Sequence, residues 1–187
     1  MCLEVELKIK VDDLTAVAGR LADLGAAHRD DFTHLDTFYG DAEGVLIRAG
    51  SALRLRRQAG RAGEKAVLTY KGPRQNGRFK TRKEIEVEIA DPDAMDALLA
   101  AMGCRRELVL EKRRTLWEYQ ECDVCLDELP ILGSFVEVEG ASEEVIEEVS
   151  GDLGLDTRQH ISKGYAGMIR RYLGRTGSTD RQVLFER

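Results

Sequence analysis

The segment from Glu4 to Lys10 alternates charged and apolar residues without interruption. Successive side chains of a β-strand point to opposite faces, so the charged residues share one face and Val5, Leu7 and Ile9 share the other. Burial can stabilise the apolar face, whereas the charged face must meet water or other charges. The pattern therefore predicts a strand with one face in a core and one strongly charged face.

Four later segments repeat this arrangement at a period of two. They are Arg54/Arg56, Arg82/Glu84/Glu86/Glu88, Lys112/Arg114 and Glu137/Glu139. On an open sheet these side chains would form cross-strand ion pairs facing water, each contributing little to stability. Inside a closed barrel they would line the lumen, where unpaired charges are costly. The periodicity by itself leaves both arrangements open.

The order of elements favours the barrel. Strands are predicted over 4–10, 32–39, 51–58, 65–71, 82–89, 108–119, 122–126 and 134–140. Helices are predicted from Asp12 or Asp13 to Leu24, over 91–102, from Ser142, and over 161–173, with capping residues at the first three starts. Adjacent strands with short links indicate an antiparallel sheet, and eight strands can close on themselves. We therefore expect an α+β fold with an eight-stranded antiparallel β-barrel and flanking helices.

Length and charge limit the possibilities further. A chain of 187 residues suits one domain, expected over 1–173, and the segment 174–187 is expected to be a flexible tail. The net charge of −6 argues against nucleic acid or an anionic membrane as the partner. No apolar run is long enough to span a bilayer, and Glu4 and Glu6 come too early for a secretory signal. A cytoplasmic location is the expectation.

Common catalytic motifs are absent from the sequence. Cys122 and Cys125 have zinc-like spacing, but residues three apart in a strand point to opposite faces, so reduced thiols are expected instead. No Walker-type glycine loop, Ser-His-Asp or Cys-His arrangement can be identified. His28, His34 and His160 are interpreted as structural polar residues.

A mixture of arginines, lysines and carboxylates does suit one class of ligand. Basic side chains meet phosphate oxygens, and an arginine can bind them with two parallel hydrogen bonds. Paired carboxylates hold Mg²⁺ or Mn²⁺, hard cations that prefer oxygen ligands and bridge phosphates. A polyphosphate with a divalent cation would satisfy both kinds of charge.

Several motifs then identify a resemblance to a known family. They are Glu4-Val5-Glu6-Leu7-Lys8, Leu53-Arg54-Leu55-Arg56, Leu68-Thr69-Tyr70-Lys71-Gly72-Pro73, Arg82 to Glu88, Lys112-Arg113-Arg114, Leu126-Asp127 and Leu132 to Glu139. In this order they resemble the CYTH superfamily of triphosphate tunnel metalloenzymes over nearly all of residues 1–173. Three segments are most similar to class IV adenylate cyclases of the CyaB type: Asp36-Thr37-Phe38-Tyr39, the run from Leu68 to Pro73, and the segment from Leu132 to Glu139.

The resemblance implies roles for individual residues. Triphosphate contacts would come from Lys8, Arg54, Arg56, Lys71, Arg82, Lys112 and Arg114, with Lys8, Lys71 and Arg114 as catalytic groups. Metal ligands would be Glu4, Glu6, Glu137 and Glu139, with Glu84, Glu86 and Asp127 as further ligands or orienting groups. Lys163 and Tyr165 correspond to a late Lys/Ser-Tyr element, although Gly164 stands where serine is common.

Three functions follow from the resemblance as hypotheses. The first is conversion of ATP to cyclic AMP and pyrophosphate with Mg²⁺ or Mn²⁺. The second is metal-dependent hydrolysis of inorganic triphosphate, thiamine triphosphate or a nucleoside triphosphate. The third is a non-catalytic module that binds polyphosphate or nucleotide, which four lumenal glutamates make less attractive. The expected partner is a small triphosphate, and relatives often pair as dimers, so a homodimer is an open expectation.

Overall fold

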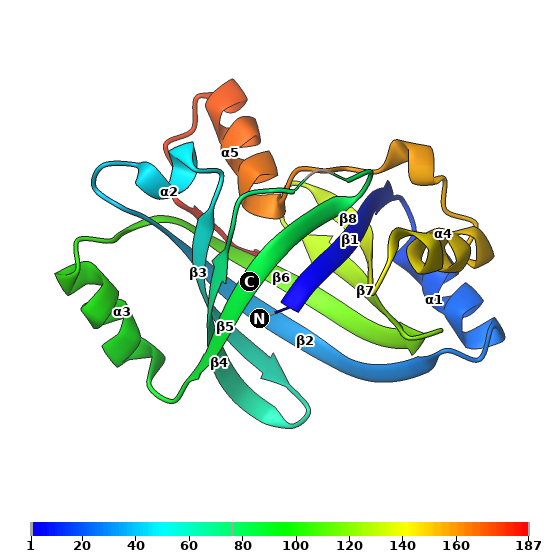
Figure 1. Ribbon diagram of the computed structural model, residues 1–187. Helices are drawn as coiled ribbons and strands as arrows, with labels where there is room; N and C mark the ends of the chain where they lie inside the picture. Colours follow the sequence, from blue (N-terminus) through cyan, green and yellow to red (C-terminus); the bar gives the residue numbers. More distant parts are fainter. Residues whose placement is uncertain (1, 76, 187) are drawn as a thin grey trace.

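Eight antiparallel strands form a closed barrel with helices around it (Figure 1). The computed structural model describes residues 2–75 and 77–186, and their side chains from Val5 onward. The strands are β1 (Cys2–Val11), β2 (Ala27–Gly40), β3 (Ala52–Gly60), β4 (Gly63–Lys71), β5 (Lys80–Ile89), β6 (Arg105–Tyr119), β7 (Cys122–Leu129) and β8 (Gly133–Gly140). They pair in the order β2-β3-β4-β5-β1-β8-β7-β6, and an additional β2–β6 pairing closes the ring. The predicted fold class is confirmed.

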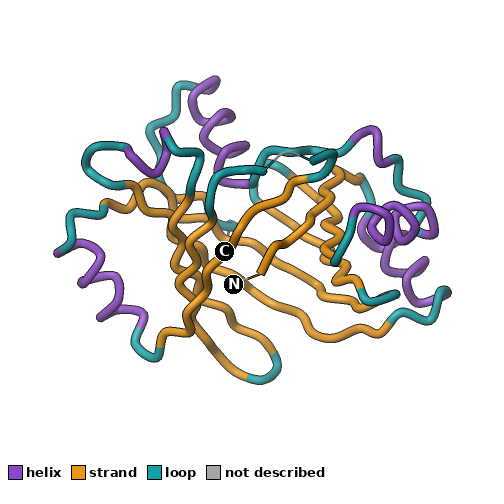
Figure 2. Tube along the Cα trace, viewed as in Figure 1, coloured by secondary structure: helices purple, strands orange, loops and turns teal. Residues whose placement is uncertain are grey.

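Five α-helices lie outside the strands, as Figure 2 shows in purple. They are α1 (Leu14–Asp23), α2 (Val45–Arg48), α3 (Pro92–Ala101), α4 (Glu143–Asp152) and α5 (Tyr165–Thr176), with a short 3₁₀ turn η1 (Thr157–Gln159). Asp13, Asp91 and Ser142 accept backbone hydrogen bonds as N-caps of α1, α3 and α4. The sequence did not predict α2, a single turn that Asp41 caps through the backbone nitrogens of Val45 and Leu46.

The apolar face of the first strand points outward, into the largest core. Val5, Leu7 and Ile9 pack there with the buried faces of α1 and α4 and with the outward side chains of β7 and β8. The charged face consequently points into the barrel, where Lys8 is only 2% exposed. Two further clusters lie under α3 and α5. The lumen arrangement, and not the solvated sheet, is the one that the structure adopts.

The C-terminal segment differs from the expected flexible tail. Helix α5 continues to Thr176, and β9 (Gln182–Val183) pairs in parallel with β6. Val183 is buried beside α5 and Phe135, and the backbone nitrogen of Phe185 donates to Glu111 over 2.9 Å. Apolar burial and these strand hydrogen bonds hold a segment that its polar composition predicted to be loose.

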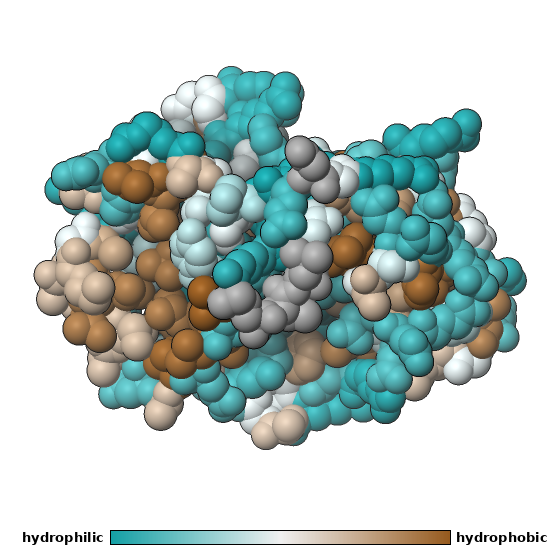
Figure 3. All heavy atoms as spheres, viewed as in Figure 1, coloured by the Kyte–Doolittle hydropathy of each residue, from teal (hydrophilic) through white to brown (hydrophobic). Residues whose placement is uncertain are grey.

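Apolar side chains gather on one outer face, shown in brown over α3 and the neighbouring strands in Figure 3. The exposed large apolar residues include Ile85 and Val87 of β5, Leu98 of α3, and Met102 directly after α3. The homodimer stays a prediction.

No helix among the described residues is long and apolar enough to cross a membrane.

Candidate functional site

A cavity of about 970 Å³ lies among the inward side chains of the barrel, and residues of α2 and α5 contribute to its lining. Strands alternate their side chains between two faces, and seven of the eight barrel strands contribute residues of one face to its lining. Ten cationic and six carboxylate side chains line it: Lys8, Arg54, Arg56, Lys71, Lys80, Arg82, Lys112, Arg114, Lys163 and Arg170 with Glu6, Asp36, Glu84, Glu86, Glu137 and Glu139. The cavity is therefore basic although the whole chain carries a net charge of −6.

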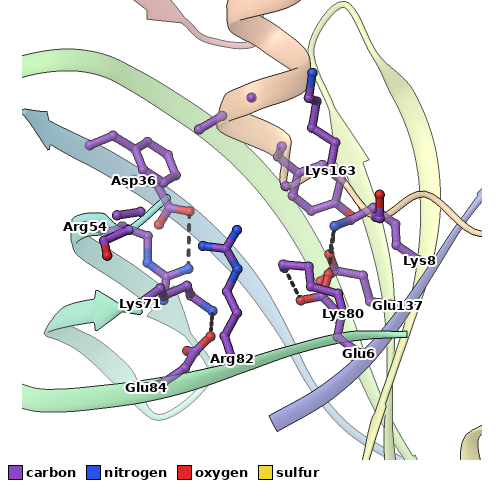
Figure 4. Close-up of a pocket in the computed structure, with 18 of the residues that line it drawn as sticks. Glu6, Lys8, Asp36, Arg54, Lys71, Lys80, Arg82, Glu84, Glu137 and Lys163 are labelled. Atoms are coloured by element: carbon purple, nitrogen blue, oxygen red, sulfur yellow. Dashed lines mark hydrogen bonds and ion pairs between the residues drawn. The ribbon is translucent and has the colours of Figure 1, made fainter. Parts of the chain in front are cut away.

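One wall of the cavity is a chain of alternating charges along β1 and β8. The register places Lys8 opposite Glu137, and Glu6 opposite Glu139. The Lys8 ammonium lies 2.8 Å from a carboxylate oxygen of Glu6 and 2.8 Å from one of Glu137. Lys80 of β5 binds the other oxygen of Glu6 at 2.5 Å (Figure 4). Each carboxylate on this wall thus already neutralises a neighbouring cation.

Asp127 extends this chain behind the wall. Its carboxylate accepts hydrogen bonds from Lys112 at 2.9 Å, from two nitrogens of Arg114 at 2.7 Å, and from the Tyr165 hydroxyl at 2.9 Å. Arg114 also pairs with Glu137. The Asp127 side chain is fully buried and does not line the cavity. This position favours the orienting role over direct metal ligation.

The opposite wall is formed by β2 to β5 (Figure 4). Arg56 forms two hydrogen bonds to Asp36, at 2.7 and 2.8 Å, and Lys71 pairs with Glu84 at 2.5 Å. Arg54 donates to Thr69, whose hydroxyl donates in turn to Glu86. Figure 4 shows the Arg82 guanidinium between the two walls, and it donates to the carbonyl oxygens of Gly50 and Gly72.

Burial and pairing together set the ionisation of these groups. Burial acts to raise the pKa of Glu137, but Lys8 and Arg114 hold it well below its usual range. Burial acts to lower the pKa of Lys8, but Glu137 and Glu6 raise it above its ordinary value. Burial and the nearby Arg114 lower the pKa of Lys112 to about 8, despite Asp127. The charge of Lys112 therefore changes as the pH passes through about 8.

The structure brings most of the predicted site residues together. All seven predicted triphosphate contacts line the cavity, as do Glu6, Glu84, Glu86, Glu137 and Glu139. Glu4 lies on β1, but its side chain is outside the described part of the chain. The proximity of these side chains does not test whether they bind triphosphate or metal, so those roles stay predictions.

Sequence reasoning missed Asp36, Lys80 and Arg170. Lys80 extends the alternation of Arg82 and Glu84 by one step toward the N-terminus, so the pattern itself could have identified it. Asp36 was noted only as part of a motif, and its pairing with Arg56 depends on the β2–β3 register. Arg170 enters the lining through α5, and no strand periodicity points to it.

The carboxylates of the first wall have the donor chemistry for a divalent cation. Glu6 and Glu137 converge on the Lys8 ammonium, so two carboxylates already hold one positive charge between them. Glu139 lies opposite Glu6 and would supply a third oxygen ligand. Within 5–75 and 77–186, no group of three or more potential ligand side chains is already gathered as a metal site. The donor set fits Mg²⁺ or Mn²⁺, provided that the cations now bound to it shift.

None of the described cysteines (Cys104, Cys122 and Cys125) and none of the three histidines lines this cavity. Cys122 packs in the core under α4, whereas Cys125 is paired in register with Glu137, on the opposite face of β7. His28 contacts Asp31, and the His160 ring lies 3.1 Å from the Thr157 carbonyl. His34 is buried, with neither ring nitrogen hydrogen-bonded among the described residues.

One protein family matches most of the chain. The family model of the CYTH domain matches residues 3–165. A protein of Methanocaldococcus jannaschii named "Putative adenylate cyclase MJ0240" is 29% identical over 146 residues, which cover 78% of this chain and 81% of that protein.

Solved structures share the fold. The PH1819 protein of Pyrococcus horikoshii has a TM-score of 0.82 and 27% identity, covering 90% of this chain and 99% of its own. HpAC1 of Hippeastrum, named a putative adenylyl cyclase with a dominant triphosphatase activity, has a TM-score of 0.64 and 19% identity, covering 96% of this chain and 98% of its own.

Proposed function

Because the chain belongs to the CYTH domain family, we propose that its cavity binds a nucleoside triphosphate and that the protein is a class IV adenylate cyclase-like enzyme. It would convert ATP to cyclic AMP and pyrophosphate. The observation that carries this proposal is the excess of cationic over carboxylate side chains that line one cavity. Asp127 and Glu107 also pair with cations of the lining, but even with these two counted the described cationic side chains outnumber the carboxylates by ten to eight, and such an excess favours an anionic ligand.

The basic residues would bind and orient the phosphates. Arg54 and Arg56 on one wall and Lys8 and Arg114 on the other face a common space, so a triphosphate could lie between them. Phosphate oxygens would replace the carboxylates that these cations now contact. Asp127 would keep Lys112 and Arg114 in place during that exchange, since it holds both from behind the wall.

Glu6, Glu137 and Glu139 would hold Mg²⁺ or Mn²⁺ once Lys8 turns toward the phosphates. When bound, such an ion supplies charge neutralisation at the phosphate oxygens. In the cyclase, the basic groups stabilise charge at the α-phosphate while the ribose 3′-hydroxyl attacks in line and pyrophosphate leaves. Lys8, Lys71 and Arg114 are our candidates for the groups that contact the reacting phosphates.

A metal-dependent triphosphatase is the alternative. The ionic groups of both walls are suited to phosphate, and the same walls could place a water molecule at the γ-phosphorus. The printed description of HpAC1, which shares the fold, names such an activity beside the cyclase. Inorganic triphosphate, thiamine triphosphate and nucleoside triphosphates are its candidate substrates.

Product analysis by chromatography distinguishes these activities. The purified protein is incubated with ATP or inorganic triphosphate, each with Mg²⁺, with Mn²⁺ or without metal. Cyclic AMP with pyrophosphate establishes the cyclase, and orthophosphate with faster consumption of triphosphate establishes the hydrolase. Glu137→Gln should abolish turnover because it weakens metal binding. Glu118→Gln is its matched control, because Glu118 is exposed and pairs with Arg29 outside the cavity lining. Absence of turnover under all conditions would overturn the enzymatic proposal.

A further inference from the structure

Tyr165 joins helix α5 to the basic wall of the cavity. It is the first residue of α5, and Ile169 and Leu173 of the same helix are buried against the barrel. Its ring meets Phe135 edge to face, with centroids 5.3 Å apart. Its hydroxyl donates to Asp127, the carboxylate that binds Lys112 and Arg114. The side chain is thus held at both its ring and its hydroxyl.

Two lysines of the cavity also lie against this ring. The Lys8 ammonium is 4.2 Å from the ring centroid, and the Lys112 ammonium is 5.2 Å from it. Both distances are within the range of cation–π attraction, which strengthens where water is excluded. Lys8 and Lys112 are each about 2% exposed. One aromatic ring therefore contacts cations from both β1 and β6.

We propose that Tyr165 is a positioning residue of the phosphate site, whose ring holds the Lys8 and Lys112 ammonium groups at the cavity wall while its hydroxyl orients Asp127. The inference rests on the proposed function, because it assigns those lysines to triphosphate. A lysine has a flexible four-carbon stem, so ordering its ammonium group costs conformational entropy. The ring offsets part of that entropy before the ligand binds, because its contact with the ammonium groups does not depend on the carboxylates that the phosphates replace. Docking of α5 then sets the position of both lysines.

Variants at this position separate the ring from the hydroxyl. Tyr165→Phe keeps the ring and removes the hydrogen bond to Asp127, whereas Tyr165→Leu removes both. Tyr172→Phe is the matched control, because Tyr172 lies on the same helix and does not line the cavity. The measurement is the dissociation constant of inorganic triphosphate by calorimetry, with Mg²⁺ and with a chelator. We expect affinity to fall by about threefold in Tyr165→Phe and at least tenfold in Tyr165→Leu.

A fluorinated series tests the ring without changing its shape. Phenylalanine analogues with one, two and three ring fluorines at position 165 weaken the quadrupole while packing stays nearly constant. We expect triphosphate affinity to fall with each fluorine, with the thermal midpoint of unfolding nearly unchanged. Equal affinities across the series, or tighter binding with fluorine, would overturn the inference.

The outcomes also separate this inference from the proposed function. A wild-type protein that binds triphosphate but turns over no substrate would refute the enzyme and leave the fluorine dependence intact. A wild-type enzyme with normal turnover and no fluorine dependence would refute only the role of Tyr165.

Discussion

The ammonium group of Lys8 lies 2.8 Å from a carboxylate oxygen of Glu137, its direct partner across the β1–β8 register. A second carboxylate, that of Glu6, lies at the same distance from this ammonium. The lysine therefore lies between the two carboxylates to which the proposed function assigns a metal ion. Binding of a metal and of a triphosphate should be mutually favourable, because each releases the protein groups that the other needs.

Substitution of Lys8 should show whether its ammonium group competes with a metal ion for the carboxylates of Glu6 and Glu137. Lys8→Gln leaves Glu6 and Glu137 buried with one cation fewer, so the free energy of unfolding should fall by about 3 kcal/mol without metal. Mg²⁺ should then raise the thermal midpoint of the variant more than that of the wild type. Urea denaturation and thermal melts with a Mg²⁺ titration measure both effects. Equal Mg²⁺ responses in the two proteins would contradict the assignment of these carboxylates.

Arg54 should contribute to substrate binding more than to folding. Arg54→Ala removes a largely buried guanidinium from the cavity, and KM for the triphosphate should rise about tenfold or more. Arg57→Ala is the control, because Arg57 lies on the same strand and pairs with Asp93 at the surface. Steady-state kinetics compare the two. Wild-type KM in Arg54→Ala would show that its guanidinium does not contact the ligand.

The charge of Lys112 should make anion binding depend on pH. Its pKa of about 8 lies below the ordinary value of 10.5, so the free protein loses this positive charge as pH rises through 8. Triphosphate favours the charged form, so binding near pH 8 should take up a proton and weaken above it. The same depression means that this residue adds stability as pH rises from about 8 to 10.5, because the unfolded chain then binds more protons.

Calorimetry in buffers of different ionisation enthalpy measures that proton uptake. Lys112→Arg is the control, because a guanidinium stays charged across this range. Proton uptake by the triphosphate itself should persist in Lys112→Arg. The proton uptake that comes from Lys112 should be absent from this variant. Identical uptake in both proteins would show that Lys112 does not titrate on binding.

The outward face of β1 should determine stability. Val5→Asp places a carboxylate in the core between the barrel and its flanking helices, where Val5 is 7% exposed. We expect a loss of about 3 kcal/mol or more in the free energy of unfolding, because an unpaired charge is buried. Lys10→Gln, on the same strand at an exposed position, should change little. Urea denaturation measures these changes in the free energy of unfolding. A urea midpoint for Val5→Asp equal to that of the wild type would contradict the observed orientation of the strand.

Local sequence was sufficient for the strands and helices with clear periodicity. The alternation from Glu4 to Lys10 determined which side chains share a face, and Asp13, Asp91 and Ser142 marked helix starts that the structure confirms. The same alternation grouped the cavity residues correctly by strand. The local pattern did not predict α2 or β9. Helix α2 depends on the Asp41 carboxylate, which accepts from its first backbone nitrogens. Strand β9 pairs with a part of β6 that lies outside the β6–β7 pairing.

Only the tertiary structure decided which face points inward and which charges meet. A period of two assigns residues to faces, but closure of the ring by β2–β6 pairing turns one face into a lumen. Strand register then decides that Lys8 meets Glu137, and the path of α5 decides that Tyr165 reaches Asp127. These contacts join residues far apart in the chain, and their energies depend on distance and burial, which a local pattern does not contain.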